Sequence, residues 1–306
     1  MNERRILVVA HAGRGDTVRA AHRVVAALRA AGATPVLAAE DHGELAAADP
    51  LFADVALLAR GDQSGVPVED VELAIVLGGD GTILRAAELV RNGTAPILGI
   101  NMGHVGFLAE IERDDMDAAV TRIIDRDYSV EERMALSIRV KDREGRVVYS
   151  TWALNEATVE KASRERMIEV IVEIDGRPLT SFGCDGMVVS TPTGATAYNF
   201  SAGGPVIWPG VEAIAVVPLS AHALFARPLV VAPGAPVAIE LLERNDGAAI
   251  LWCDGRRSHE LPPGARVVVR RSSRPVRLAR LHPSVFTDRL VRKFQLPVSG
   301  WRGSES

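Results

Sequence analysis

Residues 73–82 read LAIVLGGDGT, an apolar run that leads into three glycines around one aspartate. Such a short, continuous apolar run is typical of a parallel strand that is covered on both faces. Helical spacing follows over residues 82–91, and Gly93 then supplies the residue type that often stands just beyond a helix. The stretch therefore predicts a buried strand, a glycine-rich turn and a helix in succession.

The same order recurs elsewhere in the first half of the chain. Residues 6–10 (ILVVA) predict the first strand, and a helix is expected from an N-cap at Asp16 to Gly32. Further strands are predicted at residues 35–38, 55–58 and 96–100. Strands that alternate with helices form a sheet with helices on both faces, so we expect an α/β N-terminal domain with a parallel doubly wound sheet.

The pattern changes after about residue 127. Short alternating segments are then separated by turn signals, which stand at residues 142–145, 175–176, 245–247, 254–255 and 262–264. Helical spacing returns at residues 287–294. We therefore expect an α/β domain over 1–127, a β-rich C-terminal domain over 128–283, and a C-terminal helix and tail over 284–306 that returns to the first domain, an α+β arrangement overall.

Charge and composition exclude several classes of protein. The 306 residues carry 35 lysines and arginines against 39 aspartates and glutamates, a formal net charge of −4, which gives no general field for nucleic acid or an anionic membrane. The apolar runs are far shorter than the ~20 residues that cross a bilayer. Two cysteines, Cys184 and Cys253, favour a reducing cytoplasm over secretion. We therefore expect a cytoplasmic protein that binds neither nucleic acid nor a membrane.

The GGDGT segment at residues 78–82 favours phosphate chemistry. A helix N-terminus presents unpaired N–H groups and a positive dipole end, and glycine lets the backbone approach a phosphate closely. A carboxylate there would be held ionised by these donors, near enough to a phosphate to take the proton of an attacking hydroxyl. The alternative is that Asp80 only caps the helix and the glycines only form a tight turn.

Two further segments are rich in hydrogen-bonding groups. Residues 191–205 (TPTGATAYNFSAGGP) follow an apolar strand at 187–189 and combine hydroxyls with glycines, which suits a nucleoside. A plain surface loop is the alternative. Asn155 and Glu156 place a hydrogen-bonding pair in a strand, where an edge-strand polar pair is the alternative. Together these segments favour the functional interpretation of GGDGT.

Taken together, GGDGT at 78–82, LNEATVEK at 154–161 and CDGMVVSTPTGATAYNFSAGGP at 184–205 resemble the bacterial NAD kinase family. The order and spacing agree across nearly the whole chain, including GINMGHVGFL at 99–108 and ARPLVV at 226–231. GGDG alone is less specific, because diacylglycerol kinases, sphingosine kinases and 6-phosphofructokinases also carry it. The resemblance implies a kinase that uses ATP or polyphosphate to phosphorylate the 2′-hydroxyl of the adenosine ribose of NAD, giving NADP.

In the first domain, the resemblance implies that Asp80 is the proton acceptor. The residues that line the phosphate path would be Gly78, Gly79, Gly81, Thr82 and, as a basic group one turn into the helix, Arg85. A divalent cation, Mg²⁺ or Mn²⁺, would arrive with the phosphate donor, since the sequence shows no cluster at metal-ligand spacing. Whether Asp80 also helps to hold this ion stays open at this point.

In the second domain, the resemblance implies NAD binding and oligomerisation. Asn155 and Glu156 match the pair that holds the adenosine portion, Arg166 matches a contact to the dinucleotide, and Asp185 matches the acidic residue at the nicotinamide end. The central nucleoside-binding segment would comprise Thr196, Ala197, Tyr198 (against a base), Asn199, Phe200 and Ser201.

Two positions depart from the family pattern. Ala195 stands where many members have serine, and Gly183 stands where several bacterial relatives have arginine, so contacts from those side chains are lost. The resemblance also implies a homodimer or homotetramer. The sequence does not decide between these two, between ATP and polyphosphate, or between NAD and NADH, and it does not reveal feedback by NADPH.

Two other functions share part of this pattern. A lipid kinase would share GGDG and a two-domain plan, but it would need an apolar acceptor channel or a membrane-binding surface. A non-catalytic dinucleotide sensor on the same scaffold would bind NAD without forming NADP.

Overall fold

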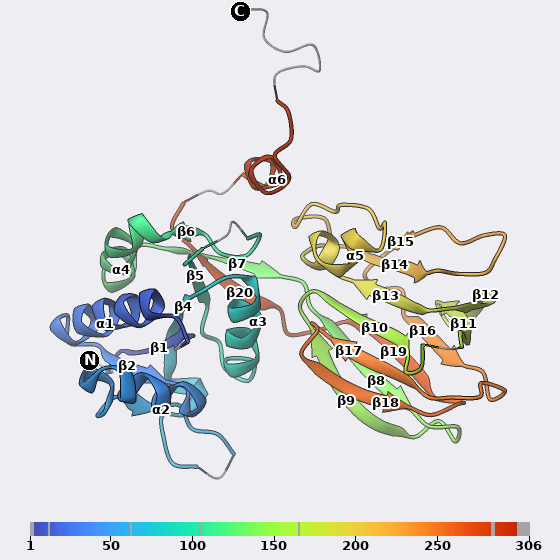
Figure 1. Cartoon of the computed structure of the whole chain (residues 1–306), viewed down its shortest axis with the longest axis horizontal. Helices are drawn as coiled ribbons and strands as arrows, with labels where there is room; N and C mark the ends of the chain where they lie inside the picture. Colours follow the sequence, from blue (N-terminus) through green and yellow to red (C-terminus); the bar gives the residue numbers. More distant parts are fainter. Residues whose placement is uncertain are drawn as a thin grey trace, which may run out of the picture. The chain divides into compact units, whose positions relative to one another are not determined.

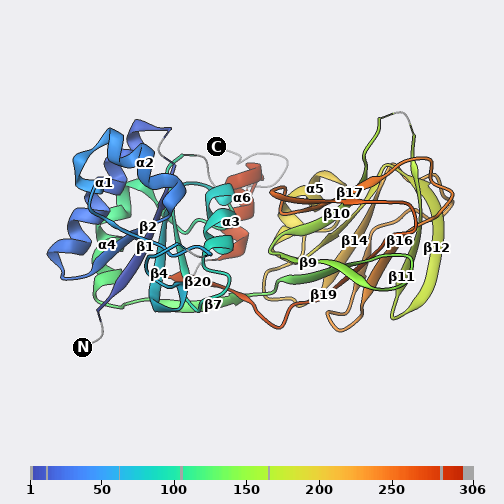
Figure 2. The same cartoon turned by 90° about the horizontal axis from the view of Figure 1, so that it is seen from below.

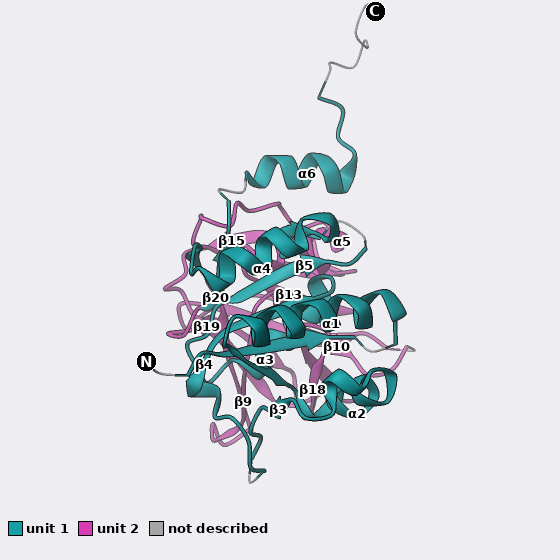
Figure 3. Ribbon diagram, turned by 90° about the vertical axis from the view of Figure 1, so that its left-hand side faces the viewer, with its two compact units in different colours: residues 1–132, 276–306 teal, residues 133–275 magenta. Residues whose placement is uncertain are grey.

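The computed structural model describes residues 3–11, 13–61, 63–103, 106–164, 166–282 and 285–298. The chain forms two compact units: unit 1 comprises residues 1–132 and 276–306, and unit 2 comprises residues 133–275 (Figure 3). The chain therefore leaves unit 1 and returns to it at its C-terminal end. Within the described ranges, no helix is long and apolar enough to cross a membrane.

Unit 1 is built on an eight-stranded sheet in the order β3-β2-β1-β4-β5-β20-β7, with β6 paired to β5. The strands are β1 (Arg5–Ala10), β2 (Thr34–Leu37), β3 (Ala56–Leu57), β4 (Val71–Leu77), β5 (Ile97–Asn101), β6 (Ile111–Glu112), β7 (Ser129–Arg133) and β20 (Val276–Arg280). From β3 to β20 the strands run parallel. The strand order reverses between β1 and β4, so their carboxyl ends form the switch point of a doubly wound sheet.

Helices cover both faces of this sheet, as its apolar strands require. They are α1 (Gly15–Ala30), α2 (Ala39–Ala48), α3 (Asp80–Leu89) and α4 (Met116–Ile124). A further helix, α6 (Phe286–Phe294), packs on the ring of Phe107. On one face, Val25 of α1 and Ile123 of α4 share a buried cluster with Ile75 of β4. On the other, Ile83 of α3 packs so closely that a Cβ at Gly99 would lie 2.5 Å from its Cδ1. Figure 2 shows α1 and α4 on one side of the strands and α3 on the other.

Unit 2 consists of two six-stranded sheets, ordered β15-β14-β13-β10-β17-β18 and β12-β11-β16-β19-β8-β9. The strands are β8 (Leu136–Lys141), β9 (Val147–Ala153), β10 (Glu156–Lys161), β11 (Ile168–Ile174), β12 (Arg177–Cys184), β13 (Gly186–Ser190), β14 (Ile214–Leu219), β15 (Leu229–Val231), β16 (Val237–Leu241), β17 (Ala249–Cys253), β18 (Arg257–Leu261) and β19 (Arg266–Arg271). Both sheets contribute to one apolar cluster, which includes Val159, Val189 and Val267. A short helix, α5 (Tyr198–Ser201), packs against β13 (Figure 1).

The predicted fold class is confirmed: unit 1 has a parallel doubly wound sheet and unit 2 is β-rich. The predicted N-cap is wrong, because α1 begins at Gly15 and the Asp16 carboxylate accepts the N–H of Thr17 at 2.9 Å within its first turn. The sequence placed residues 128–283 in the β-rich domain, whereas β7 and β20 join the sheet of unit 1. The sequence of a strand does not reveal which other strand it pairs with. Here Leu278 of β20 pairs with Ile97 of β5, which lies far away along the chain. Residues 299–306 of the predicted tail lie outside the described ranges.

Candidate active site

Asp80 opens helix α3 directly after the glycine turn that follows β4. Two backbone groups hold its carboxylate: the N–H of Phe107 donates to Oδ2 at 2.9 Å, and the N–H of Leu108 donates to Oδ1 at 3.0 Å. The chain passes so close that a Cβ at Gly106 would lie 2.3 Å from Oδ1. The segment 106–108 therefore fixes both the position and the orientation of this carboxylate.

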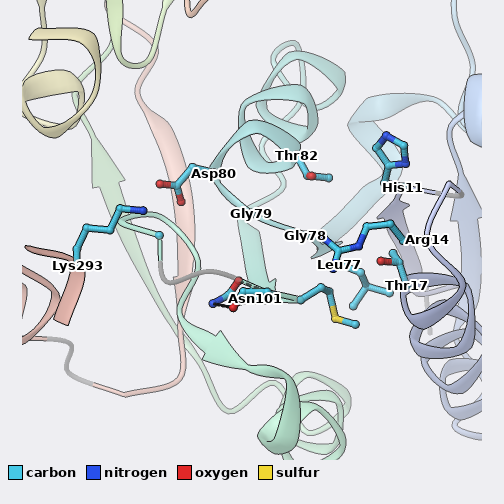
Figure 4. Close-up of a pocket in the computed structure, with 13 residues that line it drawn as sticks. His11, Arg14, Thr17, Leu77, Gly78, Gly79, Asp80, Thr82, Asn101 and Lys293 are labelled. Atoms are coloured by element: carbon cyan, nitrogen blue, oxygen red, sulfur yellow. Dashed lines mark hydrogen bonds between the residues drawn. The ribbon is translucent and has the colours of Figure 1, made fainter. Parts of the chain in front are cut away.

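A cavity of about 350 Å³ lies beside Asp80 at the carboxyl ends of β1, β4 and β5 (Figure 4). Open α/β sheets commonly bind ligands at this switch point. Among the described residues, the polar or charged ones that line the cavity are His11, Arg14, Thr17, Asp80, Thr82, Asn101 and Lys293. Glycines form much of the remaining wall, so the backbone itself is open to a ligand.

The cavity is suited to an anion such as a phosphate chain. Arg14 and Lys293 bring positive charge to it. Arg14 is also the N-cap of α1 and Gly79 the N-cap of α3, and neither position makes a side-chain capping hydrogen bond. The cavity thus lies at the N-terminal ends of two helices, whose positive dipole ends favour an anion. Among the described lining residues, Asp80 is the one carboxylate.

The predicted phosphate-path residues divide into two groups. Gly78, Gly79 and Thr82 line the cavity with Asp80, and Gly78 is required there because a Cβ would lie 2.3 Å from Thr82 Oγ1. Gly81 and Arg85 are not among the described residues of the cavity wall. The Arg85 guanidinium instead pairs with Asp41 of α2, Nη2 to Oδ1, at 2.7 Å. Burial raises the pKa of the Asp41 carboxyl, and Arg85 opposes that rise.

Sequence reasoning missed several residues of this wall. His11 and Arg14 follow β1, and Asn101 ends β5, where its Nδ2 donates to Glu112 Oε2 at 3.0 Å. A usable signal existed for these three, because residues that follow neighbouring parallel strands meet at one edge of the sheet. Lys293 had no such signal, since the sequence predicted that the terminal helix returns to the first domain but not which residues of that domain it contacts.

A second polar cluster lies in unit 2 at the start of β10. The buried carboxylate of Asp254 accepts the N–H of Leu154 at 3.0 Å and that of Asn155 at 2.7 Å. Thr191 reaches the same stretch from the end of β13: its Oγ1 donates to the Leu154 carbonyl at 2.6 Å and its N–H to the Asn155 carbonyl at 2.9 Å. These bonds hold the predicted nucleoside segment against the predicted adenosine-binding pair.

Glu156 is a second buried acid of this cluster, with 6% of its surface exposed. Burial raises the pKa of its carboxyl to about 8, the neighbouring Asp254 adds to the rise, and the N–H of Tyr198 opposes it. The carboxyl is therefore largely protonated at pH 7, and Glu156 offers a hydrogen-bond donor as well as an acceptor.

The segment 196–201 has an exposed and a buried side. Tyr198, Phe200 and Ser201 are exposed, and Thr196 and Ala197 are half-buried. Asn199 is fully buried, and its Nδ2 donates to the carbonyl oxygens of Ala195 and Pro205. Asn199 therefore shapes the loop, and the exposed side chains are the ones that a ligand can reach.

Asp185 and Arg166 both make ion pairs in unit 2. Lys161 Nζ lies 2.5 Å from Asp185 Oδ1, and its hydrogen bond lowers the pKa of the Asp185 carboxyl. Arg166 pairs with Asp246, and Arg166 and Lys161 line a second cavity of about 460 Å³. Arg166 is therefore part of the wall of that cavity, and Asp185 contacts the wall through Lys161.

Solved structures of two known proteins share this fold. The crystal structure of yeast NADH kinase complexed with NADH aligns with a TM-score of 0.85 at 20% identity, covering 98% of this chain and 89% of that one. An NAD kinase from Archaeoglobus fulgidus in complex with ATP aligns with a TM-score of 0.70 at 23% identity, covering 96% of this chain and 98% of that one.

Comparisons of the sequence with known families and proteins give the same family for both units. Residues 6–128 match the ATP-NAD kinase N-terminal domain, and residues 154–281 match the ATP-NAD kinase C-terminal domain. An NAD kinase of Leifsonia xyli subsp. xyli is 64% identical over 303 residues, which cover 99% of this chain and 98% of the relative. NAD kinase 2 of Streptomyces coelicolor is 56% identical over 302 residues, which cover 98% and 97%. The chain therefore belongs to the NAD kinase family.

Proposed function

We propose that this NAD kinase transfers the terminal phosphoryl group of ATP to the 2′-hydroxyl of the adenosine ribose of NAD, giving NADP and ADP, with Asp80 as the proton acceptor. The observation that carries the proposal is the Asp80 carboxylate, fixed by two N–H donors at the edge of a cavity suited to phosphate. Membership of the family over nearly the whole chain excludes the lipid-kinase alternative.

Asp80 acts on the attacking hydroxyl. As the bond from the ribose oxygen to phosphorus forms, the bond from phosphorus to the bridging oxygen of ADP breaks, and the hydroxyl proton passes to the carboxylate. A carboxylate is a weak base for an alcohol, but the proton leaves late, when the oxygen has lost electron density to phosphorus. Help of this kind contributes roughly 10²- to 10⁴-fold to the rate, and positioning supplies much of the rest.

The donor phosphates occupy the cavity of unit 1 in this proposal. Gly78 and Gly79 let the chain of phosphates approach the backbone, and Arg14 neutralises part of its charge. Gly81, which is exposed, keeps the turn free of a side chain. Arg85 stays paired with Asp41 and supports the helix that carries Asp80.

The donor set of the cavity fits a Mg²⁺ or Mn²⁺ ion that arrives on the nucleotide. The described residues contain no group of three or more His, Cys, Asp or Glu side chains that could hold a metal by themselves. Asp80 would be the carboxylate ligand, and Mg²⁺ commonly combines so few protein ligands with waters and phosphate oxygens. When bound, the ion neutralises charge on the phosphates.

The acceptor NAD is held by unit 2 in this proposal. Asn155 and Glu156 hold the adenosine portion, and Tyr198 stacks on a base. The exposed side chains of residues 196–201 line the path that the NAD molecule takes. Asp185 meets the nicotinamide end, with Arg166 as a further contact. The proposal is supported by the hydrogen bonds from Thr191 to the backbone of residues 154–155, which bring the hydroxyl-rich segment 191–205 next to Asn155 and Glu156.

The proposal extends to assembly and location. We expect a homodimer or homotetramer that associates through unit 2, where Leu224, Phe225 and Val230 are exposed. Light scattering after size-exclusion chromatography measures this directly. We expect a cytoplasmic location, which suits Cys184 and Cys253, both free and buried thiols.

A coupled assay tests the function. The purified chain is given NAD, Mg²⁺ and ATP, and NADP is detected with an NADP-specific dehydrogenase. We expect NADP to form, and separate reactions with polyphosphate and with NADH define the donor and acceptor range. Calorimetric binding of NAD without any NADP would instead support a dinucleotide sensor.

A further inference from the structure

The C-terminal helix α6 brings a lysine to the phosphate cavity. Lys293 lines this cavity together with Arg14 and the Gly78–Asp80 turn. In Figure 4 its side chain extends toward the Asp80 carboxylate, whereas Arg14 lies on the far side of the glycine turn. The two cations that line the cavity among the described residues therefore flank it from opposite sides.

Specific contacts fix α6 in this position. Nη1 of Arg289 donates to the carbonyl oxygen of Phe107 at 2.6 Å and to that of Ala109 at 2.9 Å. The ring of Phe107 also contacts those of Phe286 and Phe294, with centroid distances of 6.1 and 5.8 Å. Contacts from the beginning, middle and end of the helix thus converge on residues 107–109.

The same segment orients Asp80. The N–H groups of Phe107 and Leu108 hold the Asp80 carboxylate, while the carbonyl groups of Phe107 and Ala109 hold α6. Asp80 and Lys293 are therefore both placed by one short stretch of backbone. A helix that merely covered the sheet would not need this arrangement.

We propose that Lys293 is a donor-binding residue that contacts the terminal phosphate of ATP, the group that is transferred. This inference rests on the proposed function. The transferred phosphoryl group must lie next to Asp80, which takes the proton of the attacking hydroxyl, and Lys293 enters the cavity on that side. A lysine ammonium on a flexible stem is a compact charge well suited to a phosphate oxygen. Arg14 is placed to contact the phosphates nearer to the adenosine of ATP.

The test is steady-state kinetics of Lys293→Met with competitive inhibitors. Lys293 is exposed, so the variant is expected to fold, which circular dichroism checks. We expect the KM for ATP, and the inhibition constant of a non-hydrolysable ATP analogue, to rise roughly tenfold, as loss of a charge-assisted contact implies. The inhibition constant of ADP, which lacks the terminal phosphate, and the KM for NAD should change less than about twofold. Lys293→Arg should recover much of the loss.

The matched control is Arg292→Met. Arg292 is the neighbouring cation of α6, lies 3.9 Å from Glu112 and is not among the described residues of the cavity wall. It should keep the wild-type constants. Wild-type constants in Lys293→Met, an equal rise for ADP and the ATP analogue, or an equal effect of Arg292→Met would each overturn the inference. Absence of NADP formation by the wild-type chain would instead refute the proposed function, so the two failures are distinguishable.

Discussion

Gly194 lies against the backbone of Asn155: a Cβ added at Gly194 would lie 2.1 Å from the Asn155 carbonyl oxygen. Rotation of a side chain cannot relieve such a contact, because the neighbouring atom belongs to the main chain. The glycine therefore lets two segments far apart in the sequence meet, one rich in hydroxyls and one carrying the proposed adenosine-binding pair.

Gly194→Ala should damage this junction. Forcing the two backbones apart should lower the free energy of unfolding by roughly 1–3 kcal/mol, as overpacking does. It should also raise the KM for NAD more than the KM for ATP, since the donor cavity lies in unit 1. Urea denaturation and steady-state kinetics measure both effects.

Gly210→Ala is the control for this prediction. Gly210 is exposed, and nothing lies within 4 Å of a Cβ built there. It should keep wild-type stability and KM. Wild-type stability in Gly194→Ala would show that the close approach is not a constraint in solution.

Asp80→Asn should separate chemistry from binding. The amide keeps the size of the carboxyl but is a far poorer proton acceptor, and its NH2 group cannot accept one of the two N–H bonds from Phe107 and Leu108, so kcat should fall roughly 10²- to 10⁴-fold. NAD affinity, measured by calorimetry, and the circular dichroism spectrum should stay near those of the wild type. Turnover close to the wild-type value would remove Asp80 from the role of base.

Much of the fold was predictable because the decisive signals are local. The apolar runs of β1 and β4 end at glycine-rich turns, and helical spacing follows each of them. Local sequence patterns therefore predicted the alternation of strands and helices. The position of Asp80 between glycines predicted a phosphate-binding site. Helix α2 was not predicted, because its sequence consists mostly of small or charged residues. Its buried apolar residue Leu45 does not by itself give a helical spacing.

The rest depends on contacts between segments distant in the sequence. The N–H groups that hold Asp80 come from Phe107 and Leu108, and the lysine in the cavity comes from the last helix. Asp254 stands in a hairpin turn, where its sequence suggests only a turn residue, yet it anchors Asn155. Hydrogen bonds of this kind leave no periodic pattern for a sequence to display.

Arg257→Met should destabilise the anchor of the adenosine-binding pair. Nη2 of Arg257 lies 2.7 Å from Oδ2 of Asp254, and the guanidinium stacks 4.5 Å above the ring of Trp152. Without Arg257 the buried carboxyl of Asp254 keeps its bonds from the Leu154 and Asn155 N–H groups but loses its charged partner, which costs roughly 1–3 kcal/mol. We expect a lower free energy of unfolding in urea and a raised KM for NAD. Arg256→Met, at an exposed position in the same hairpin, is the control, and an equal loss there would refute a specific role for Arg257.

Glu156 predicts a pH dependence of stability with a definite sign. Burial raises the pKa of its carboxyl from 4.5 to about 8. Between these values the folded state binds more protons than the unfolded state, so the free energy of unfolding falls as the pH rises, by up to about 1.4 kcal/mol per pH unit. This stabilisation is complete below pH 4.5 and is lost as the pH rises through about 8. Glu156→Gln removes the ionisable proton, so urea denaturation at pH 6, 7 and 8 should show a flatter slope than the wild type.

Glu173→Gln is the matched control, because Glu173 is also a buried glutamate in a strand. The hydrogen bond from Arg266 lowers the pKa of its carboxyl, so its stabilisation is present above pH 4.5 and is lost only on acidification. Glu173→Gln should therefore reduce stability by the same amount at pH 6 and pH 8 and keep the wild-type slope. If Glu156→Gln kept that slope as well, the Glu156 carboxyl would be ionised in the folded protein at neutral pH, and its proposed hydrogen-bond donor would be lost.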